Sequence, residues 1–228
     1  MTDAHRAARA LFLAAALAVA LPASADDIDD AQVWLAINAA GSIKGKLEGQ
    51  FDVNTRHFDN ATHLGHVQVR GLLGWRFSKD VLLGAGYSYV YNESQSGRVV
   101  EEHRIFQQAN FPIARIGKAQ LVGRTRLEQR TFSNIDGVAL RLRQQVRLNV
   151  PLEGPKGLRA IIYTEPFFLL NRPTGSAPTG LNQIRSFAGL GIPVTGNSSL
   201  EAGYMNQAIF PGQDRFNHVL NMGFSIRF

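Results

Sequence analysis

The chain of 228 residues contains no cysteine. Disulfide bridges and thiolate chemistry, whether catalytic or metal-binding, are therefore excluded. Beyond residue 25 the sequence also lacks any apolar run approaching the roughly 18 residues that a membrane-spanning helix needs. It has no G-x-S-x-G motif, and the glycines of 84–86 and 189–191 lie inside alternating segments rather than in phosphate-binding loops. The common catalytic motifs thus assign no reaction.

Residues 1–25 have the three parts of a secretory signal peptide. Arg6 and Arg9 supply a positive start, Ala10–Leu21 is a continuous apolar core, and a small-residue cleavage site reading Ala-Ser-Ala follows. The apolar core is too short to span a bilayer. We therefore expect cleavage of residues 1–25 and one exported domain over residues 26–228. The alternative is a buried N-terminal helix of a cytosolic protein.

Positive charge is in excess but is not gathered into runs. The chain has 24 Lys and Arg against 18 Asp and Glu, a formal net charge of +6. A basic composition often indicates nucleic-acid binding. Here the export signal and the placement of arginines at alternate positions argue against it, so no nucleic-acid partner is expected.

The rest of the chain consists of segments in which apolar and polar residues alternate, separated by turns rich in Gly, Asn, Asp and Pro. Because successive side chains of a strand point to opposite faces, this alternation predicts strands with one apolar and one polar face. Eleven candidate strands are found, at residues 32–40, 46–56, 64–77, 81–91, 99–111, 120–132, 140–150, 158–169, 181–192, 200–207 and 218–228.

The last of these segments, His218–Phe228, shows the pattern most clearly. Its apolar face consists of Leu220, Met222, Phe224, Ile226 and Phe228. An apolar face that includes the terminal phenylalanine suits a strand with lipid on one side and a polar lumen on the other. The segment resembles the closing strand of bacterial outer-membrane barrels, in which a C-terminal phenylalanine is part of the signal that the barrel-assembly machinery reads.

These patterns predict an all-β protein, a transmembrane antiparallel up-and-down β-barrel in the outer membrane of a Gram-negative bacterium. Bacterial barrels usually have an even strand number, so we expect about 12 strands, with 10 as the alternative. A soluble β-sandwich or lipocalin-like barrel is the competing fold. The expected partners are outer-membrane lipids, which an aromatic girdle of Tyr87, Tyr89 and Tyr91 would meet, and the assembly machinery.

The polar faces of two neighbouring segments carry the one site-like group of charges. Residues 120–132 and 140–150 each present several arginines on a single face, and like charges directly opposite each other in a sheet are destabilising. The arginines therefore need carboxylates, ordered water or bound anions. Candidate carboxylates include Glu48 and Glu201, and the predicted lumen charge network is Glu102, Arg104, Arg124, Arg126, Glu128, Arg130, Arg141, Arg143, Arg147 and Glu165.

Three functions are compatible with such a network. The first is a narrow anion-favouring channel, or a binding barrel for an anionic small solute. The second is a closed structural barrel in which the Arg/Glu network is only internal packing. The third is a lipid-modifying enzyme, but the sequence has no His-x-Ser pair, and the side chains of His63 and His66 would point to opposite faces of a strand. No catalytic centre, cofactor or metal site is expected.

The charged segments also carry a resemblance to a known family. Their order resembles that of a bacterial outer-membrane family catalogued as domain of unknown function 2490, and the segments are residues 101–108, 124–130, 141–143 and 165–168. The resemblance extends from Trp34 to Phe228 and implies an outer-membrane β-barrel with no assigned activity. Pro166 departs from a regular strand, and we expect a bulge or a strand end there.

Overall fold

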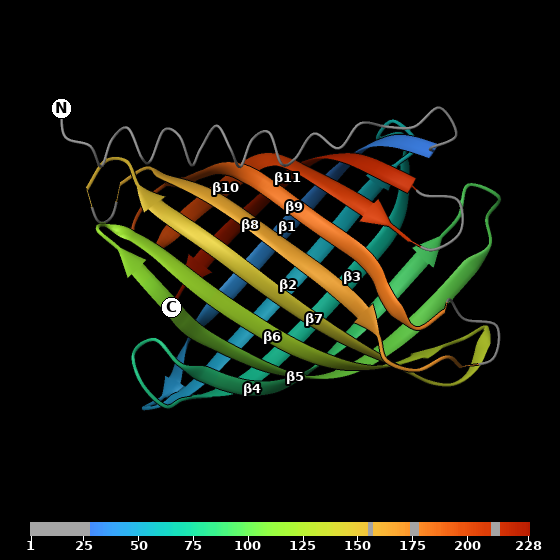
Figure 1. Ribbon diagram of the computed structural model, residues 1–228, viewed down its shortest axis with the longest axis horizontal. Coiled ribbons are helices and arrows are strands. Elements are labelled where there is room, and N and C mark those ends of the chain that lie inside the picture. Colours follow the sequence, from blue (N-terminus) through green and yellow to red (C-terminus); the bar gives the residue numbers. More distant parts are fainter. Residues whose placement is uncertain (1–27, 155–156, 174–177, 211–214) are drawn as a thin grey trace.

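The computed structural model of the protein describes residues 28–154, 157–173, 178–210 and 215–228, so the predicted signal peptide lies outside the described residues. These residues form strands only, and the order along the chain is β1 (Ile28–Lys44), β2 (Leu47–Phe58), β3 (His63–Arg76), β4 (Leu82–Glu93), β5 (Val99–Ile116), β6 (Ala119–Phe132), β7 (Ile135–Pro151), β8 (Arg159–Leu169), β9 (Gly180–Pro193), β10 (Ser198–Ile209) and β11 (Arg215–Arg227) (Figure 1). Each of the eleven predicted strands is present.

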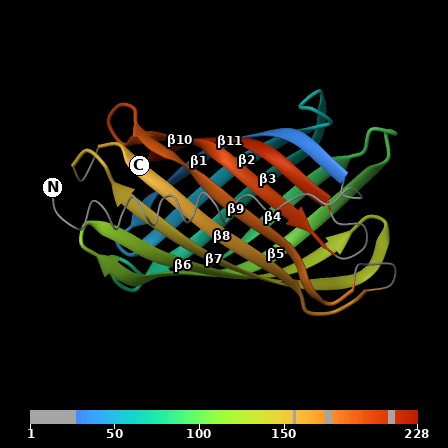
Figure 2. The ribbon, with the colours of Figure 1, turned by 45° about the horizontal axis from the view of Figure 1, so that its top comes forward.

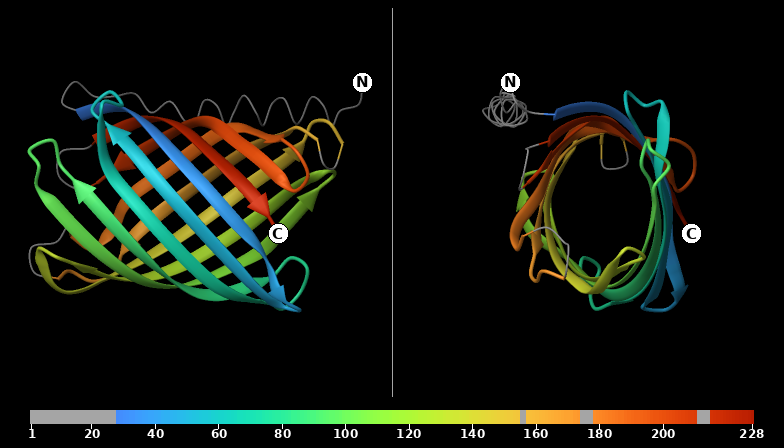
Figure 3. Two further views of the ribbon diagram at one scale, coloured as in Figure 1. Left: turned by 180° about the vertical axis from the view of Figure 1, so that it is seen from behind. Right: turned by 90° about the vertical axis from the view of Figure 1, so that its right-hand side faces the viewer.

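The strands form one closed barrel in sequence order. They run obliquely to its long axis, and the end-on view shows a complete ring (Figures 2 and 3). Every consecutive pair is antiparallel, whereas β1 and β11 close the ring as a parallel pair, with Ile28 opposite Arg215 and Ala40 opposite Arg227.

The parallel seam follows from the strand number. Each strand of an up-and-down barrel reverses the direction of the one before it, so the first and last strands run in the same direction when the number is odd. The ring closes with eleven strands in the described residues, and the expected count of about 12, with 10 as the alternative, is not confirmed. An even strand number was expected because bacterial single-chain barrels usually have one, whereas an odd strand number is known from a mitochondrial channel.

The apolar faces of the strands point outward. On β3, Leu73 and Trp75 are 60% and 49% exposed, while Leu72, directly before Leu73, is 5% exposed. On β11, Leu220 is 50% exposed and Val219 is fully buried. The described residues contain no helix long and apolar enough to cross a membrane.

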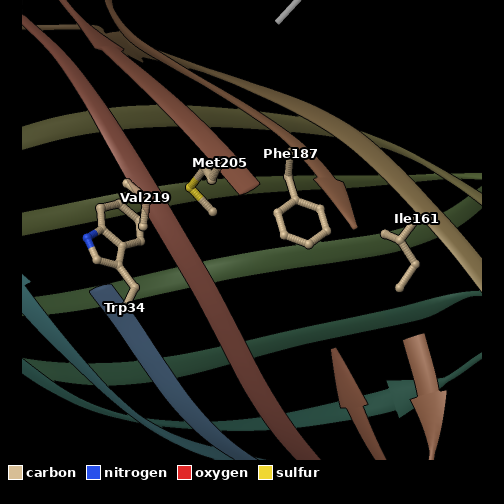
Figure 4. Close-up of a cluster of buried hydrophobic side chains, with 5 residues drawn as sticks. All are labelled: Trp34, Ile161, Phe187, Met205 and Val219. Atoms are coloured by element: carbon tan, nitrogen blue, oxygen red, sulfur yellow. The ribbon is translucent and has the colours of Figure 1, made fainter. Parts of the chain in front are cut away.

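Inside the barrel, apolar side chains form two clusters between the polar ones. The larger extends over neighbouring strands β8 to β11 and β1 (Figure 4), and it contains Trp34, Ile161, Phe187, Met205 and Val219. The smaller joins β3, β4 and β5 through Leu72, Leu82 and Phe106. The interior is therefore a mixture of apolar packing and charge rather than a uniformly polar wall.

Gly86 on β4 lets the ring of Phe106 lie against the wall. A β-carbon at Gly86 would stand 2.2 Å from the carbonyl oxygen of Gly71 and 2.4 Å from Cζ of Phe106. Phe106 is 1% exposed and cannot move aside without opening the smaller cluster. Glycine at this position is required by a close approach, not by an unusual backbone angle.

We expect Gly86→Ala to lower the free energy of unfolding by about 1–3 kcal/mol, because an added methyl group overpacks the site. Urea titration followed by circular dichroism measures the change. Gly71→Ala is the matched control, since a β-carbon there has no atom within 4 Å. Equal stability of the two variants would contradict this account of Phe106 packing.

Candidate functional site

Glu102 on β5 lies between two arginines inside the barrel. Arg104 follows on the same strand, and Arg130 faces Arg104 directly across the β5–β6 ladder. Glu102 is 1% exposed. Its carboxylate accepts hydrogen bonds from Arg104 Nη2 at 2.7 Å and from Arg130 Nη2 at 3.1 Å. The shared carboxylate thereby offsets the repulsion between two opposed arginines.

Glu128 on β6 is shared by three arginines. Its ladder partner Arg141 donates from Nε at 2.6 Å, and Arg143 donates from Nη1 at 2.9 Å. Arg126, which faces Arg143 in the ladder, holds Nη1 3.8 Å from the carboxylate and donates from Nε to Gln108 at 2.8 Å. Because Glu128 is 1% exposed, guanidinium groups rather than water balance its charge.

Glu165 on β8 extends this arrangement to a third strand. Arg143 donates to it from Nε and Nη2 at 3.1 and 3.0 Å, and Arg124 donates from Nη2 at 2.9 Å. Arg143 therefore bridges Glu128 and Glu165. Of the ten residues that the sequence analysis selected, nine contact the carboxylates of Glu102, Glu128 and Glu165 or provide them.

Pro166 follows Glu165 in the middle of β8. A proline has no amide hydrogen for the ladder, which is why an irregularity is expected there. The strand continues to Leu169, but the β8–β9 register shifts between Phe167 and Phe168, and the β7–β8 pairing is interrupted opposite Glu165 and Pro166. The expected departure from a regular strand is therefore found as a shift of register and not as a strand end, and it lies beside the buried carboxylate.

Two further carboxylates named from the sequence have different partners. Glu201 on β10 accepts hydrogen bonds from Arg147, with Nη2 at 2.6 Å, so it does meet the arginines of β7. Glu48 on β2 instead pairs with Arg76 of the neighbouring strand β3. Glu48 lies near the start of β2, several strands away from β6 and β7 around the ring, and this explains why it cannot reach them.

Aromatic rings lie beneath the buried arginines. The Cζ atoms of Arg141 and Arg143 lie 5.3 and 4.4 Å from the ring centre of Phe167, and that of Arg126 lies 4.5 Å from the ring centre of Phe106. Both rings are 1% exposed. These cation–π contacts fix the guanidinium planes from the side that the carboxylates do not cover.

A cavity of about 1580 Å³ occupies the barrel interior. Its lining reaches Asn60 and Gln95 in the turns at one end and Asn197 and Arg227 at the other. A second cavity of about 390 Å³ is lined in part by the arginines of β6. Arg70 and Asp52 also line it, and Arg70 donates to Asp52 at 2.7 Å. The sequence analysis did not identify this pair.

Five arginines that line the large cavity differ from the rest. Within the described ranges, Arg215 and Arg227 at the two ends of β11 and Arg56, Arg159 and Arg185 have no carboxylate at ion-pair distance. In the amide orientation that satisfies its neighbours, the Gln183 side-chain oxygen accepts from Arg185 Nε and Nη2 at 2.5 and 3.0 Å. The alternation of the sequence could predict that Arg56, Arg159 and Arg185 point into the barrel. It could not predict that they lack a carboxylate partner, because that depends on which strands the closed ring brings together.

The histidines of the described strands do not share one face of the barrel wall. His66 points inward, whereas Nδ1 of His103 and Nδ1 of His218 on the outer face lie 2.6 and 2.7 Å from the hydroxyl oxygens of Tyr87 and Tyr204. Nowhere in the part of the chain that the structure describes do three or more His, Asp or Glu side chains form a group that could hold a metal.

The fold and its interior define a closed β-barrel with a buried network of arginines and glutamates. The chain belongs to the family described as "Protein of unknown function (DUF2490)", whose sequence profile matches residues 31–217. It is also similar to an uncharacterised protein of Methylorubrum extorquens, with 31% identity over 217 residues, which cover 93% of this chain and 94% of the relative. No solved structure matches the chain.

Proposed function

We propose that the protein is an outer-membrane β-barrel of a Gram-negative bacterium whose interior forms a narrow, anion-favouring channel or a binding barrel for an anionic solute. The outward apolar side chains of the strands support contact with lipid, and the signal-like residues 1–25 support export. The apolar face of β11, with Ile226 44% and Phe228 64% exposed, supports recognition by the assembly machinery.

The outer tyrosines support the same placement. Tyr87, Tyr89 and Tyr204 all lie on the outer face, and each hydroxyl has a polar partner there, respectively His103, Glu101 and His218. An aromatic ring with a hydrogen-bonded hydroxyl suits the boundary between lipid and water. We infer that these tyrosines form one girdle of the barrel.

The observation that carries the anion-favouring role is the charge balance along the large cavity. Twelve arginines and seven carboxylates line this cavity, an excess of five positive charges. Among these arginines, Arg56, Arg159 and Arg185 have no carboxylate of the described residues at ion-pair distance, and the cavity reaches both ends of the barrel. A positive potential in a confined space concentrates anions and excludes cations.

A structural barrel is the second candidate, and the burial of the network favours it. Glu102, Glu128 and Glu165 are 1–2% exposed and each serves at least two arginines. Such a network can join distant strands without binding any solute. In both candidate functions, the channel and the structural barrel, we propose that the protein does not act as an enzyme.

Planar-bilayer recording of the refolded residues 26–228 across a KCl gradient separates the two candidates. We expect discrete conductance steps and a reversal potential of the sign that anion selectivity gives. Heat-modifiable gel migration of the same sample serves as the folding control. A cation-selective reversal potential would refute the anion-favouring interior. A silent bilayer from folded protein would refute the channel, and silence without binding of an anionic solute would favour the structural barrel.

A further inference from the structure

Two of the arginines without carboxylates meet on one tryptophan. The Cζ atom of Arg56, on β2, lies 3.9 Å from the ring centre of Trp34, and that of Arg185, on β9, lies 4.7 Å from it. Trp34 is 5% exposed and belongs to the larger apolar cluster. Two guanidinium groups are thus held against one rigid indole ring. Among the described side chains no carboxylate lies at ion-pair distance from either of them, although Glu165 is the ladder partner of Arg185.

The orientation of the indole ring is fixed by hydrogen bonds. Trp34 Nε1 donates to Gln32 Oε1 at 2.8 Å, and Gln32 Nε2 donates to Asp30 Oδ2 at 2.7 Å. Asp30 also accepts from the backbone amides of Asp59 and Asn60, at 3.2 and 3.1 Å. The carboxylate of Asp30 is therefore committed to the turn between β2 and β3, and it forms no ion pair with either arginine.

A buried histidine acceptor completes the group. Trp34, Arg56 and His66 lie side by side on β1, β2 and β3 by the ladder register, and all line the large cavity. His66 Nδ1 donates to Asn92 Oδ1 at 2.7 Å, which leaves Nε2 as an acceptor. Nε2 is buried and has no partner in the described residues, and His66 is 3% exposed. A buried polar atom of this kind requires a partner.

The chemistry of these groups specifies a ligand. Two guanidinium groups with no described carboxylate at ion-pair distance match an oxyanion with two negative charges, although Arg185 also donates from Nε and Nη2 to Gln183. An unpaired acceptor beside them matches a hydroxyl donor on the same ligand. We propose that Trp34, Arg56, His66 and Arg185 form a binding site for a small, doubly charged oxyanion that carries its own hydroxyl group, such as hydrogen phosphate. This inference rests on the anion-favouring interior and names its ligand class.

Trp34 provides the direct measurement. The chain has two tryptophans, and Trp75 lies on the outer face at 49% exposure, so Trp75→Phe leaves Trp34 as the only indole. We expect titration of this refolded variant with inorganic phosphate, at a pH just above neutrality, to give a saturable change in its fluorescence. Bound phosphate draws the stacked guanidinium groups away from the ring. Absence of a saturable change would overturn the proposal.

Removal of either charge should weaken phosphate binding. In the Trp75→Phe background, Arg56→Gln and Arg185→Gln are each expected to raise the dissociation constant for phosphate about tenfold. Arg159→Gln is the matched control, because Arg159 lines the same cavity without a carboxylate but pairs with Gly191, about 20 Å along β9 from Arg185. If Arg159→Gln weakens binding equally, the effect is general lumen charge and the site is refuted. If a glutamine variant does not fold, Arg56→Lys or Arg185→Lys is measured in its place. Unchanged phosphate affinity in the lysine variant would also refute a site with bidentate arginines.

Sulfate tests the role of His66. Sulfate has the size and charge of hydrogen phosphate but no hydroxyl donor, so an unpaired acceptor should favour phosphate by at least tenfold. His66→Phe is expected to abolish this preference while sulfate still binds. Equal binding of the two anions by the parent would remove His66 from the site.

Anion-selective conductance without phosphate binding would refute the site alone, whereas phosphate binding in a silent bilayer would refute only the channel.

Discussion

Replacement of Glu128 by glutamine is expected to lower the free energy of unfolding by about 3–5 kcal/mol. The substitution keeps the size of the side chain and removes its charge. Arg126, Arg141 and Arg143 would then face one another without the carboxylate they share, since Arg126 and Arg143 are directly opposed in the β6–β7 ladder. Little water can replace the lost charge at a position that is 1% exposed.

Glu201→Gln is the matched control for this experiment. Glu201 has a single arginine partner, Arg147, and both side chains are 22% exposed, so water can solvate the remaining guanidinium. We expect a loss of about 1 kcal/mol or less. Urea titration of both refolded variants measures the difference. If Glu128→Gln unfolds at the same urea concentration as Glu201→Gln, the buried network does not stabilise the barrel.

Simultaneous replacement of Arg56, Arg159 and Arg185 by glutamine is expected to lower the anion-to-cation permeability ratio roughly fivefold or more. A unit charge acts on an ion at 4 Å with about 1 kcal/mol in bulk water, and more in a confined lumen, which corresponds to about that factor. The folded state should persist, because none of the three arginines forms an ion pair within the described strands.

Reversal potentials in a KCl gradient measure this change. Arg126 and Arg143 of the predicted lumen network are less suitable targets, because they are 3% and 6% exposed and paired with glutamates, so their replacement would change stability together with selectivity. A triple variant with the selectivity of the parent would show that the unpaired arginines do not set the potential along the cavity.

The strands were predictable because alternation is a local property. The predicted segment 120–132 corresponds to β6, Ala119–Phe132, and 46–56 to β2, Leu47–Phe58. The prediction for β5 ended too early, at residue 111, although the strand continues to Ile116, because the bulge between Pro112 and Ala114 breaks the alternation there. The pattern itself contained eleven strands, and the preference for an even number was the less reliable guide.

The partners of the charges were predictable only where they lie on neighbouring strands. Glu128 and Arg141 are ladder partners and could be matched from the turn between β6 and β7. Arg185 reaches Trp34 although β10 and β11 lie between their strands, and this contact exists only because the ring is closed. No periodicity in the sequence encodes such a contact.

The parallel seam has a consequence for how barrels of this kind can be altered. Ile28 and Phe228 lie at opposite ends of the wall, about 40 Å apart along the thirteen residues of β11. A circular permutant would therefore need a linker that runs the whole height of the barrel. Duplication or deletion of a hairpin changes the strand number by two and preserves the parallel closure, so only the gain or loss of a single strand would return both ends to the same rim.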